Sequence, residues 1–437
     1  MSNTAPPALG EEAFGEQPKD EEVSGKEAFG EKLRGEESTA AESSGGEVEQ
    51  RVSWAELFFD LVWVFAITQI AAALADTATP GAVGRTLLLL VPLWWGWTGV
   101  TLLGNLAGPA IDRTAGRLTL FALSGCGLLM AIAVPHAYGA QPWAFAGGCV
   151  LLRLVVAVAI HLRTRPRLGR WHPFSATLLL GGPLLLAGAA FDGSGRAVFW
   201  AAAALADLGC WSLLGRRLDA VRFETGHLPE RFGLFVIIAL GETVVAVGGQ
   251  AARAPLDLPA ATATGLAFVL IATLWWTYFH YGAPAARHSI RHSPSTARTV
   301  REVFTYAHAS YATAVIGVAV GLKKLVAHPF DHPHGPPALL LAPGVALYLF
   351  SFCYARLRMF GAVGVPRLLG ALACTALAAL APVLPGAATA ALATAVLLAV
   401  NAAEAWYVET GRPLPLLRPP VRRRSGSAAS ATPRTRG

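Results

Sequence analysis

The chain has 437 residues, of which 54% are hydrophobic and only 14% are charged. Soluble domains average about 25% charged residues, so this composition excludes an ordinary soluble globular protein. The net charge of +7 is unevenly distributed, since residues 1–50 contain 13 acidic and 4 basic side chains. The composition predicts an integral membrane protein with an acidic N-terminal tail and a basic remainder.

The first 50 residues contain two copies of Glu-Ala-Phe-Gly-Glu, at 12–16 and 27–31, among polar and small residues. Such a segment has too few apolar side chains to offset the entropy of ordering, so we expect disorder. It is either a spacer or an acidic segment that contacts a partner. Residues 409–437 are predicted to form a second disordered tail, which is basic.

Apolar runs long enough to cross about 30 Å of hydrocarbon recur from residue 54 onward. Backbone polar groups cannot face lipid unpaired, so the runs must be helices. The prediction is an all-α, polytopic membrane helix bundle with about 12 transmembrane helices, near residues 54–75, 84–104, 117–137, 142–162, 174–192, 196–214, 232–250, 261–282, 303–322, 337–355, 367–384 and 387–408.

The number of basic residues alternates between high and low in successive loops between the predicted spans. Loops after even-numbered spans contain 17 arginines, whereas loops after odd-numbered spans contain 5 lysines and arginines. The positive-inside rule therefore places the even-numbered loops and both termini in the cytoplasm. We expect a multi-pass protein of the bacterial inner (cytoplasmic) membrane whose basic face contacts membrane lipids.

The two halves of the chain share a sequence pattern. The segment from Glu56 to Gln69 resembles the segment from Glu230 to Thr243, 174 residues later. The tryptophan pair at 94–95 matches the pair at 275–276. Six spans per repeat is an even number, so the repeats would be parallel. This predicts a 6+6 parallel internal repeat with halves at 51–225 and 226–408, and chance similarity of apolar helices is the alternative.

Two acidic residues lie four positions apart in the first span. Glu56 and Asp60 therefore project from one helix face. A charge facing lipid at a helix centre costs at least about 2.5–3.5 kcal/mol, so both should point inward. They either bind a cation or proton at the mouth of a hydrated path, or pair with arginines to fix helix packing.

Glu242 lies about 16 Å into the seventh span, near the bilayer midplane. A carboxylate at this depth marks a functional site by default, where a protonated form could take and release a proton. The alternative is a protonated side chain that hydrogen-bonds another helix.

Other polar residues lie within the predicted spans. Arg153 needs a carboxylate partner, for which Asp60, Asp207 and Glu242 are the candidates. His280 and His308 are either proton carriers or satisfied core residues. The remaining candidates for an ion or solute path are Gln69, Asn105, Glu230 and Arg231.

Motifs of soluble enzyme chemistry are missing from the sequence. It has no phosphate-binding loop, nucleophile elbow or zinc-ligand spacing, so we expect no enzymatic activity, no cofactor and no metal site. The arginines of the C-terminal tail have no folded reader or aromatic platform beside them, so nucleic acid is not an expected partner.

The residues above resemble those of the bacterial low temperature requirement protein A family. The resemblance is carried mainly by residues 56–69, which begin Glu-Leu-Phe-Phe-Asp, and by residues 227–242, which begin His-Leu-Pro-Glu-Arg. Residues 94–97 with Asn105, 275–279 and 306–308 support it, so that it covers about 51–408. His280 departs from the pattern, since the family often has an acidic residue there. The resemblance implies a multi-pass inner-membrane protein linked by name to growth in the cold.

These observations predict a secondary transporter or proton-linked permease with a central acidic path that includes Asp60, Glu242 and His308. A cation channel built from two six-helix repeats is one alternative. A structural or stress-related membrane protein without transport is the other. The transported partner would be a small solute or a cation, and oligomers remain possible.

Overall fold

The computed structural model describes residues 51–77, 79–164, 167–169, 171–253, 255, 257–333 and 335–418. The predicted tail at 1–50 lies outside these residues, as does most of the predicted tail at 409–437. Within the described ranges, twelve helices are long and apolar enough to cross a membrane. This confirms the all-α polytopic fold.

The first six spans match the predicted runs within a few residues at most ends. They are α2 (Trp54–Ala75); α3 (Pro80–Ala107) with η1 (Gly108–Asp112); α4 (Thr114–Ala133) with η2 (Val134–His136); α5 (Pro142–Thr164); α6 (Pro173–Ala176), η3 (Thr177–Gly181) and α7 (Gly182–Ala190); and α8 (Gly193–Leu214) with η4 (Gly215–Ala220).

The last six spans also match the predicted runs within a few residues at most ends, and two of them contain π-helical turns. They are α9 (His227–Ala251); α10 (Leu258–Trp276), η5 (Thr277–Gly282) and α11 (Ala283–Arg291); α12 (Thr296–Thr299), η6 (Val300–Ala307) and α13 (His308–Ala327); η7 (Pro336–Leu340) with α14 (Leu341–Phe360); α15 (Val365–Leu380) with η8 (Ala381–Val383); and α16 (Gly386–Glu409).

Apolar side chains cover the outside of the bundle as well as its core. Helix α8, for example, exposes Val198, Leu205 and Leu213 by 66%, 68% and 81%. A row of exposed aliphatic side chains on one helix face is expected where that face contacts lipid. Arg196 was counted above among the five basic residues of loops after odd-numbered spans, but it lies within α8, is buried, and pairs with Asp192 at 2.8 Å.

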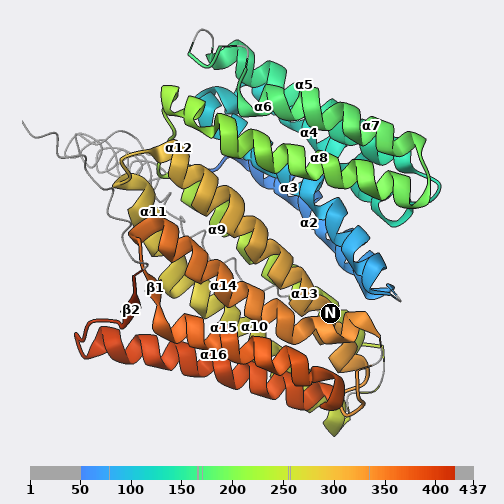
Figure 1. Ribbon diagram of the computed structural model, residues 1–437, viewed down its shortest axis with the longest axis vertical. Coiled ribbons are helices and arrows are strands. Elements are labelled where there is room, and N and C mark those ends of the chain that lie inside the picture. The colour runs from blue at the N-terminus through green and yellow to red at the C-terminus, as the bar shows by residue number, and fades with distance from the viewer. Residues whose placement is uncertain are drawn as a thin grey trace, which may run out of the picture. The chain divides into compact units, whose positions relative to one another are not determined.

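Helices of each half lie mainly beside one another. In Figure 1 the helices from α2 to α8 lie toward the upper right of the bundle, and the helices from α9 to α16 toward the lower left. The halves meet where α2 and α3 pack against α9 and α13. We call the end of the bundle that carries the connections after even-numbered spans the arginine-rich end.

The order of helix contacts is similar in the two halves. In the first half α2 packs on α4, α4 on α5, and α7 on α8. The corresponding spans of the second half pack likewise, α9 on α13, α13 on α14, and α15 on α16. This similarity supports the 6+6 repeat and the division near residue 225, which stay predictions.

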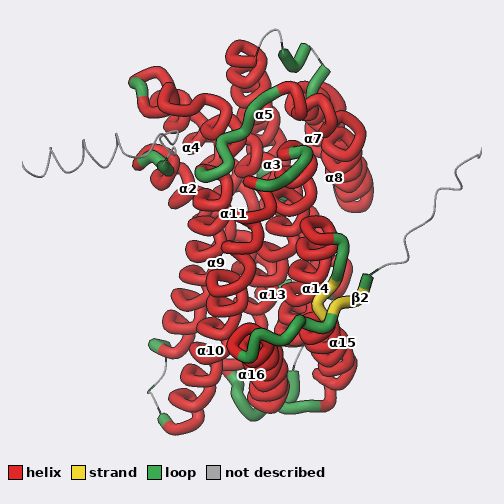
Figure 2. Tube along the Cα trace, turned by 90° about the vertical axis from the view of Figure 1, so that its left-hand side faces the viewer, coloured by secondary structure: helices red, strands yellow, loops and turns green. Residues whose placement is uncertain are grey.

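Two very short strands connect the C-terminal segment to the bundle. β1 (Val363–Gly364) precedes α15, and β2 (Leu416–Leu417) follows α16. They pair antiparallel, with Val363 opposite Leu417 and Gly364 opposite Leu416. Figure 2 shows these strands beside α14 and α15. Residues 416–417 thus have regular structure although they lie within the predicted C-terminal tail.

Candidate functional site: a buried charge cluster between the two halves

The first helix begins with a capping box that turns an acid inward. The Ser53 N–H donates to Glu56 Oε2 at 3.0 Å, and the Glu56 N–H donates to Ser53 Oγ at 3.3 Å. This reciprocal pair satisfies backbone donors that a helix start leaves free. Asp60 follows one turn later on the same face, and Glu56 and Asp60 are each 1% exposed. The prediction that both acids point away from lipid is therefore correct in geometry.

Helix α9 faces these acids with two basic side chains at the same spacing. His227 and Arg231 lie four residues apart and are both 0% exposed. His227 Nε2 lies 3.2 Å from Glu56 Oε1, and Arg231 Nη1 lies 3.0 Å from Asp60 Oδ2. Arg231 Nε is 3.9 Å from Glu56 Oε1. Two acids of the first half are thus matched, turn by turn, with two bases of the second half.

Helix α3 completes the cluster. The Trp97 indole N–H donates to Asp60 Oδ1 at 2.9 Å, and the Trp97 ring lies 5.9 Å from the Arg231 guanidinium carbon. Cations are attracted to the faces of indole rings at this range. We call Glu56, Asp60, Trp97, Asn105, His227 and Arg231 the inter-half charge cluster.

Asn105 orients the histidine of this cluster. Its amide donates to the Glu224 carbonyl at 2.9 Å and accepts from the Glu224 N–H at 3.0 Å. Asn105 Nδ2 also lies 3.4 Å from His227 Nδ1. An amide N–H beside Nδ1 favours the tautomer that carries its proton on Nε2, which can then be donated to Glu56.

The packing around Glu56 needs a glycine on α3. A Cβ atom at Gly104 would lie 2.2 Å from Glu56 Oε1. Any side chain at this position would displace the carboxylate, so Gly104 makes room for the inward acid.

Several charged atoms of the cluster have no aligned hydrogen-bond partner. Glu56 Oε1, Asp60 Oδ2 and all three Arg231 nitrogens lack an aligned hydrogen-bond partner. Arg231 Nε and Nη1 nevertheless lie within ion-pair distance of these two carboxylates. A buried charge network with poor alignment is costly, because each misaligned group forfeits part of the compensation for desolvation. With neutral His227 the ionised cluster carries one net negative charge, and one proton neutralises it.

Arg153 belongs to a different site. Its guanidinium forms a two-pronged ion pair with Asp207 of α8, at 2.9 and 2.6 Å, and donates to the Thr177 carbonyl at 3.1 Å. Of the three predicted carboxylate partners, Asp207 is the correct one. The arginine therefore does not join Asp60 and Glu242, and it fixes packing within the first half.

Glu242 lies farther along the same seam between α2 and α9. Its side chain is half-buried and interacts with the Thr68 hydroxyl of α2, next to the half-buried Gln69. Eleven residues separate Glu242 from Arg231, about 16 Å along the helix. The structure therefore places Asp60 and Glu242 in separate environments of one seam.

The other predicted residues are scattered. Glu230 is half-buried and has no charge partner among the described residues, whereas its neighbour Arg231 faces α2. His280 is exposed and stacks on Trp276 with ring centroids 4.8 Å apart. Neither contributes to the inter-half charge cluster.

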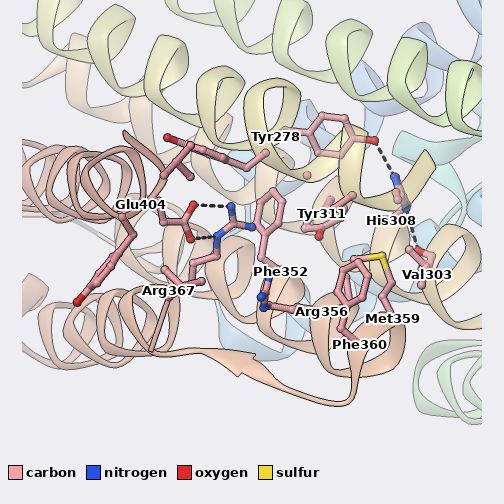
Figure 3. Close-up of a pocket in the computed structure, with 18 of the residues that line it drawn as sticks. Tyr278, Val303, His308, Tyr311, Phe352, Arg356, Met359, Phe360, Arg367 and Glu404 are labelled. Carbon is pink, nitrogen blue, oxygen red and sulfur yellow. Dashed lines mark hydrogen bonds and ion pairs between the residues drawn. The ribbon is translucent and has the colours of Figure 1, made fainter. Parts of the chain in front are cut away.

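His308 is a buried histidine with a partner for each ring nitrogen. Its Nδ1 lies 2.9 Å from the Val303 carbonyl, and its Nε2 lies 2.7 Å from the Tyr278 hydroxyl (Figure 3). A carbonyl only accepts, so Nδ1 carries the proton and Nε2 accepts from the tyrosine. This arrangement is typical of a neutral core histidine.

Two further sets of charged residues were not among the residues predicted to line an ion or solute path. Arg367 pairs with Glu404 at 2.6 and 2.7 Å within the second half. Glu302 is buried among three arginines, Arg298, Arg301 and Arg358. The pairing of His227 with Glu56 was also missed, although the equal four-residue spacing on the two helices was a usable signal. Among the described residues, no group of three or more His, Cys, Asp or Glu could hold a metal ion.

Fold and site together define a multi-pass helical membrane protein whose two halves share a buried set of charges. Residues 51–402 match the model of the family described as bacterial low temperature requirement A protein (LtrA), and the chain belongs to this family. It is also similar to an uncharacterized protein of Rhizobium meliloti (strain 1021), with 30% identity over 300 residues, 65% of this chain and 71% of that protein. No solved structure matches the chain.

Proposed function

We propose that this protein is a proton-linked secondary transporter of the bacterial cytoplasmic membrane, with its arginine-rich end and both termini in the cytoplasm. The single observation that carries the proposal is the inter-half charge cluster. One half supplies Glu56 and Asp60, and the other supplies His227 and Arg231. A change of charge there alters the contact between the halves, which is what alternating access needs.

The inter-half charge cluster has the chemistry of a proton-binding site. Glu56 and His227 are joined by a short polar contact, both are buried, and one proton decides whether the cluster is neutral. Its misaligned ion pairs lower the cost of exchanging partners when the halves move. Glu242 lies deeper in the same seam and is the second candidate proton carrier.

The buried, ion-paired carboxylates of the cluster favour a transporter over a channel. The Asp60 side chain is held by the Trp97 indole and by Arg231, and it is 1% exposed. Rings of charge that select ions in open pores contact water. An ion that passed this point would have to separate the ion pairs, which is a conformational step rather than diffusion.

The first test needs no substrate. Spectroscopic labels would be placed on the exposed positions Arg113→Cys in the first half and Arg287→Cys in the second half, in protein reconstituted into lipid. We expect the distance distribution between the labels to differ between pH 8 and pH 5, and Glu56→Gln to abolish this difference. Identical distance distributions at both pH values, in the labelled protein that keeps Glu56, would refute proton-linked movement of the halves.

The second test measures transport in proteoliposomes that contain a pH-sensitive dye. Addition of solutes from a panel of organic anions, cations and amino acids should produce a saturable proton flux for at least one of them. Glu56→Gln should reduce this flux at least 10-fold, whereas the exposed Asp112→Asn serves as the matched control and should leave it unchanged. Voltage-driven flux that does not saturate, or the absence of any coupled flux, would contradict the proposal.

A further inference from the structure

A cavity of about 300 Å³ lies within the second half at the arginine-rich end. It is formed by η5, α11, η6 and α13 together with the adjoining ends of α14, α15 and α16. Figure 3 shows its aromatic and basic lining. It is separate from the inter-half charge cluster, since none of the six cluster residues lines it.

Basic side chains outnumber acidic ones in this cavity. Arg356, Arg367 and Arg412 line it, whereas Glu404 is its one carboxylate. Glu404 is fully occupied by Arg367, which approaches it with two nitrogens at 2.6 and 2.7 Å. With these two charges balanced, two guanidinium groups remain without a carboxylate partner among the described residues.

Arg356 is the deeper of the two. It lies beside β1, since a Cβ atom at Gly364 would approach its Cδ to 3.8 Å. Its Nε is buried and has no hydrogen-bond partner among the described residues, and its guanidinium carbon lies 5.6 Å from the centroid of the Phe360 ring. A buried guanidinium nitrogen without a partner costs free energy unless an anion approaches it.

Arg412 marks the outer part of the same cavity. It is exposed and stacks on Trp406, with its guanidinium carbon 4.8 Å from the ring centroid. A planar guanidinium at the mouth and another inside give a positive potential along the approach from solvent. Guanidinium groups bind carboxylates and phosphates through parallel hydrogen bonds.

The walls are apolar and largely aromatic. Tyr278, Tyr311 and Phe352 pack edge-on or tilted against one another, with ring centroids 4.7–6.3 Å apart. Arg367 lies 4.3 Å from the centroid of the Phe352 ring and holds it in place. Pockets of this size that combine aromatic walls with a few polar groups are typical sites for small molecules.

We propose that this cavity binds a small organic monoanion, with a carboxylate on Arg356 and a flat apolar body against Tyr311 and Phe352. An aromatic carboxylate from the cytoplasm has this chemistry. An anionic lipid shares the combination of one negative charge and an apolar body, and the experiment separates the two. The inference concerns binding alone, so it does not depend on whether the protein transports anything.

Binding is tested on the full chain in nanodiscs of zwitterionic lipid. Benzoate and 3-phenylpropanoate would be titrated by calorimetry and by thermal shift, with benzamide as a neutral analogue of the same shape. We expect saturable binding of at least one carboxylate and at least 10-fold weaker binding of benzamide. Equal affinity for the neutral analogue, or no binding of either carboxylate, would overturn the inference.

Arg356→Gln should weaken carboxylate binding at least 10-fold. The matched control is Arg287→Gln, an exposed arginine of the neighbouring α11 outside the cavity lining, which should bind normally. The unliganded Arg356→Gln protein should melt no lower than the unaltered protein, because the substitution removes an unpaired charge. A lower melting temperature together with unchanged affinity would assign Arg356 to packing and refute the site.

The lipid source is examined in nanodiscs that contain phosphatidylglycerol. If Arg356 binds a small carboxylate rather than a lipid headgroup, native mass spectrometry should show equal retention of this lipid by the unaltered protein and by Arg356→Gln. Retention of phosphatidylglycerol that depends on Arg356, without binding of either carboxylate, would overturn the assignment to a soluble ligand.

Discussion

Every buried carboxylate in the described spans has a basic partner. Glu56 and Asp60 contact bases of α9, while Asp207, Glu302 and Glu404 each contact arginines. Charges that leave water need such pairing, because desolvation costs several kcal/mol per ion. The pairs differ in alignment. Asp207 and Glu404 make two aligned bonds each, whereas the inter-half charge cluster leaves several atoms without aligned partners.

The aligned pairs should behave as structural units. Arg153→Met or Asp207→Leu alone leaves one uncompensated buried charge and should destabilise the protein by about 3–5 kcal/mol. The double variant removes both charges and should recover most of this loss. Thermal unfolding in detergent, followed by fluorescence-detected size exclusion, measures the four proteins of the cycle. Additive losses in the double variant would show that the two side chains do not form a coupled pair.

One histidine outside the spans should make stability sensitive to acid. Burial, together with the nearby His161, lowers the pKa of His172 to about 4. The unfolded chain, with an ordinary pKa near 6.5, then binds more protons between pH 6.5 and pH 4. Stability contributed by this site is present above pH 6.5 and is lost as the pH falls toward 4, by at most about 3 kcal/mol.

His172→Asn tests this sensitivity and keeps a helix-capping side chain. His172 Nδ1 accepts the Ser175 N–H at 3.3 Å at the start of α6, and an asparagine oxygen can take that role. Melting temperatures at pH 7.5 and pH 4.5 should differ less for the variant than for the unaltered protein. Parallel pH profiles for the two proteins would show that His172 does not titrate in this range.

At the scale of elements, wide helical turns create acceptors that distant side chains use. In the π segments η3 and η6 the regular hydrogen-bond ladder is shifted, and their carbonyls accept from other groups. Arg153 donates to the Thr177 carbonyl, His308 Nδ1 to the Val303 carbonyl, and the Trp94 indole to the Thr305 carbonyl at 3.0 Å. The last bond joins α3 of the first half to the ninth span.

Two adjacent tryptophans provide a matched comparison for this bond. Trp94→Phe removes the donor to the buried Thr305 carbonyl and should cost about 1–3 kcal/mol beyond the loss of ring area. Trp95 stacks on Tyr306 at 6.1 Å, but its Nε1 has no hydrogen-bond partner. Trp95→Phe should therefore be the milder change in thermal unfolding. Equal losses for the two variants would argue against a role for the indole bond.

The spans were predictable because one physical constraint defines them. A helix must satisfy its own backbone across the hydrocarbon, so apolar length alone located α2 at residues 54–75 as observed. Helix ends beyond the hydrocarbon obey no such rule. Predicted spans that stopped at 104 and 282 continue to Asp112 and Arg291, the first through the short segment η1 and the second through helix α11.

The partners of charged residues were not predictable from one sequence. Solvation shows that Arg153 needs an acid, but Asp60, Asp207 and Glu242 all satisfied that condition. Only the packing of α5 against η3 and α8 selects Asp207. The same limit applies to Asp60, whose partners on α3 and α9 lie 37 and 171 residues away.

At the scale of the whole molecule, the placement of charge predicts the orientation that the proposed function assumes. Connections after even-numbered spans carry most of the arginines, and the cavity and the inter-half charge cluster both lie toward that end. All five cysteines are buried, so single exposed cysteines can report sidedness. Arg113→Cys and Arg287→Cys lie at the arginine-rich end, and Arg253→Cys and His332→Cys at the opposite end.

The positive-inside rule makes a definite prediction for these four variants. A membrane-impermeant maleimide applied to intact cells should modify Arg253→Cys and His332→Cys. It should modify Arg113→Cys and Arg287→Cys only after permeabilisation. The opposite labelling would invert the protein, place the cavity outside, and remove the cytoplasmic source of its ligand. Labelling of Arg113→Cys and Arg287→Cys from different sides would contradict the even number of spans between them, and with it the parallel arrangement of the two halves.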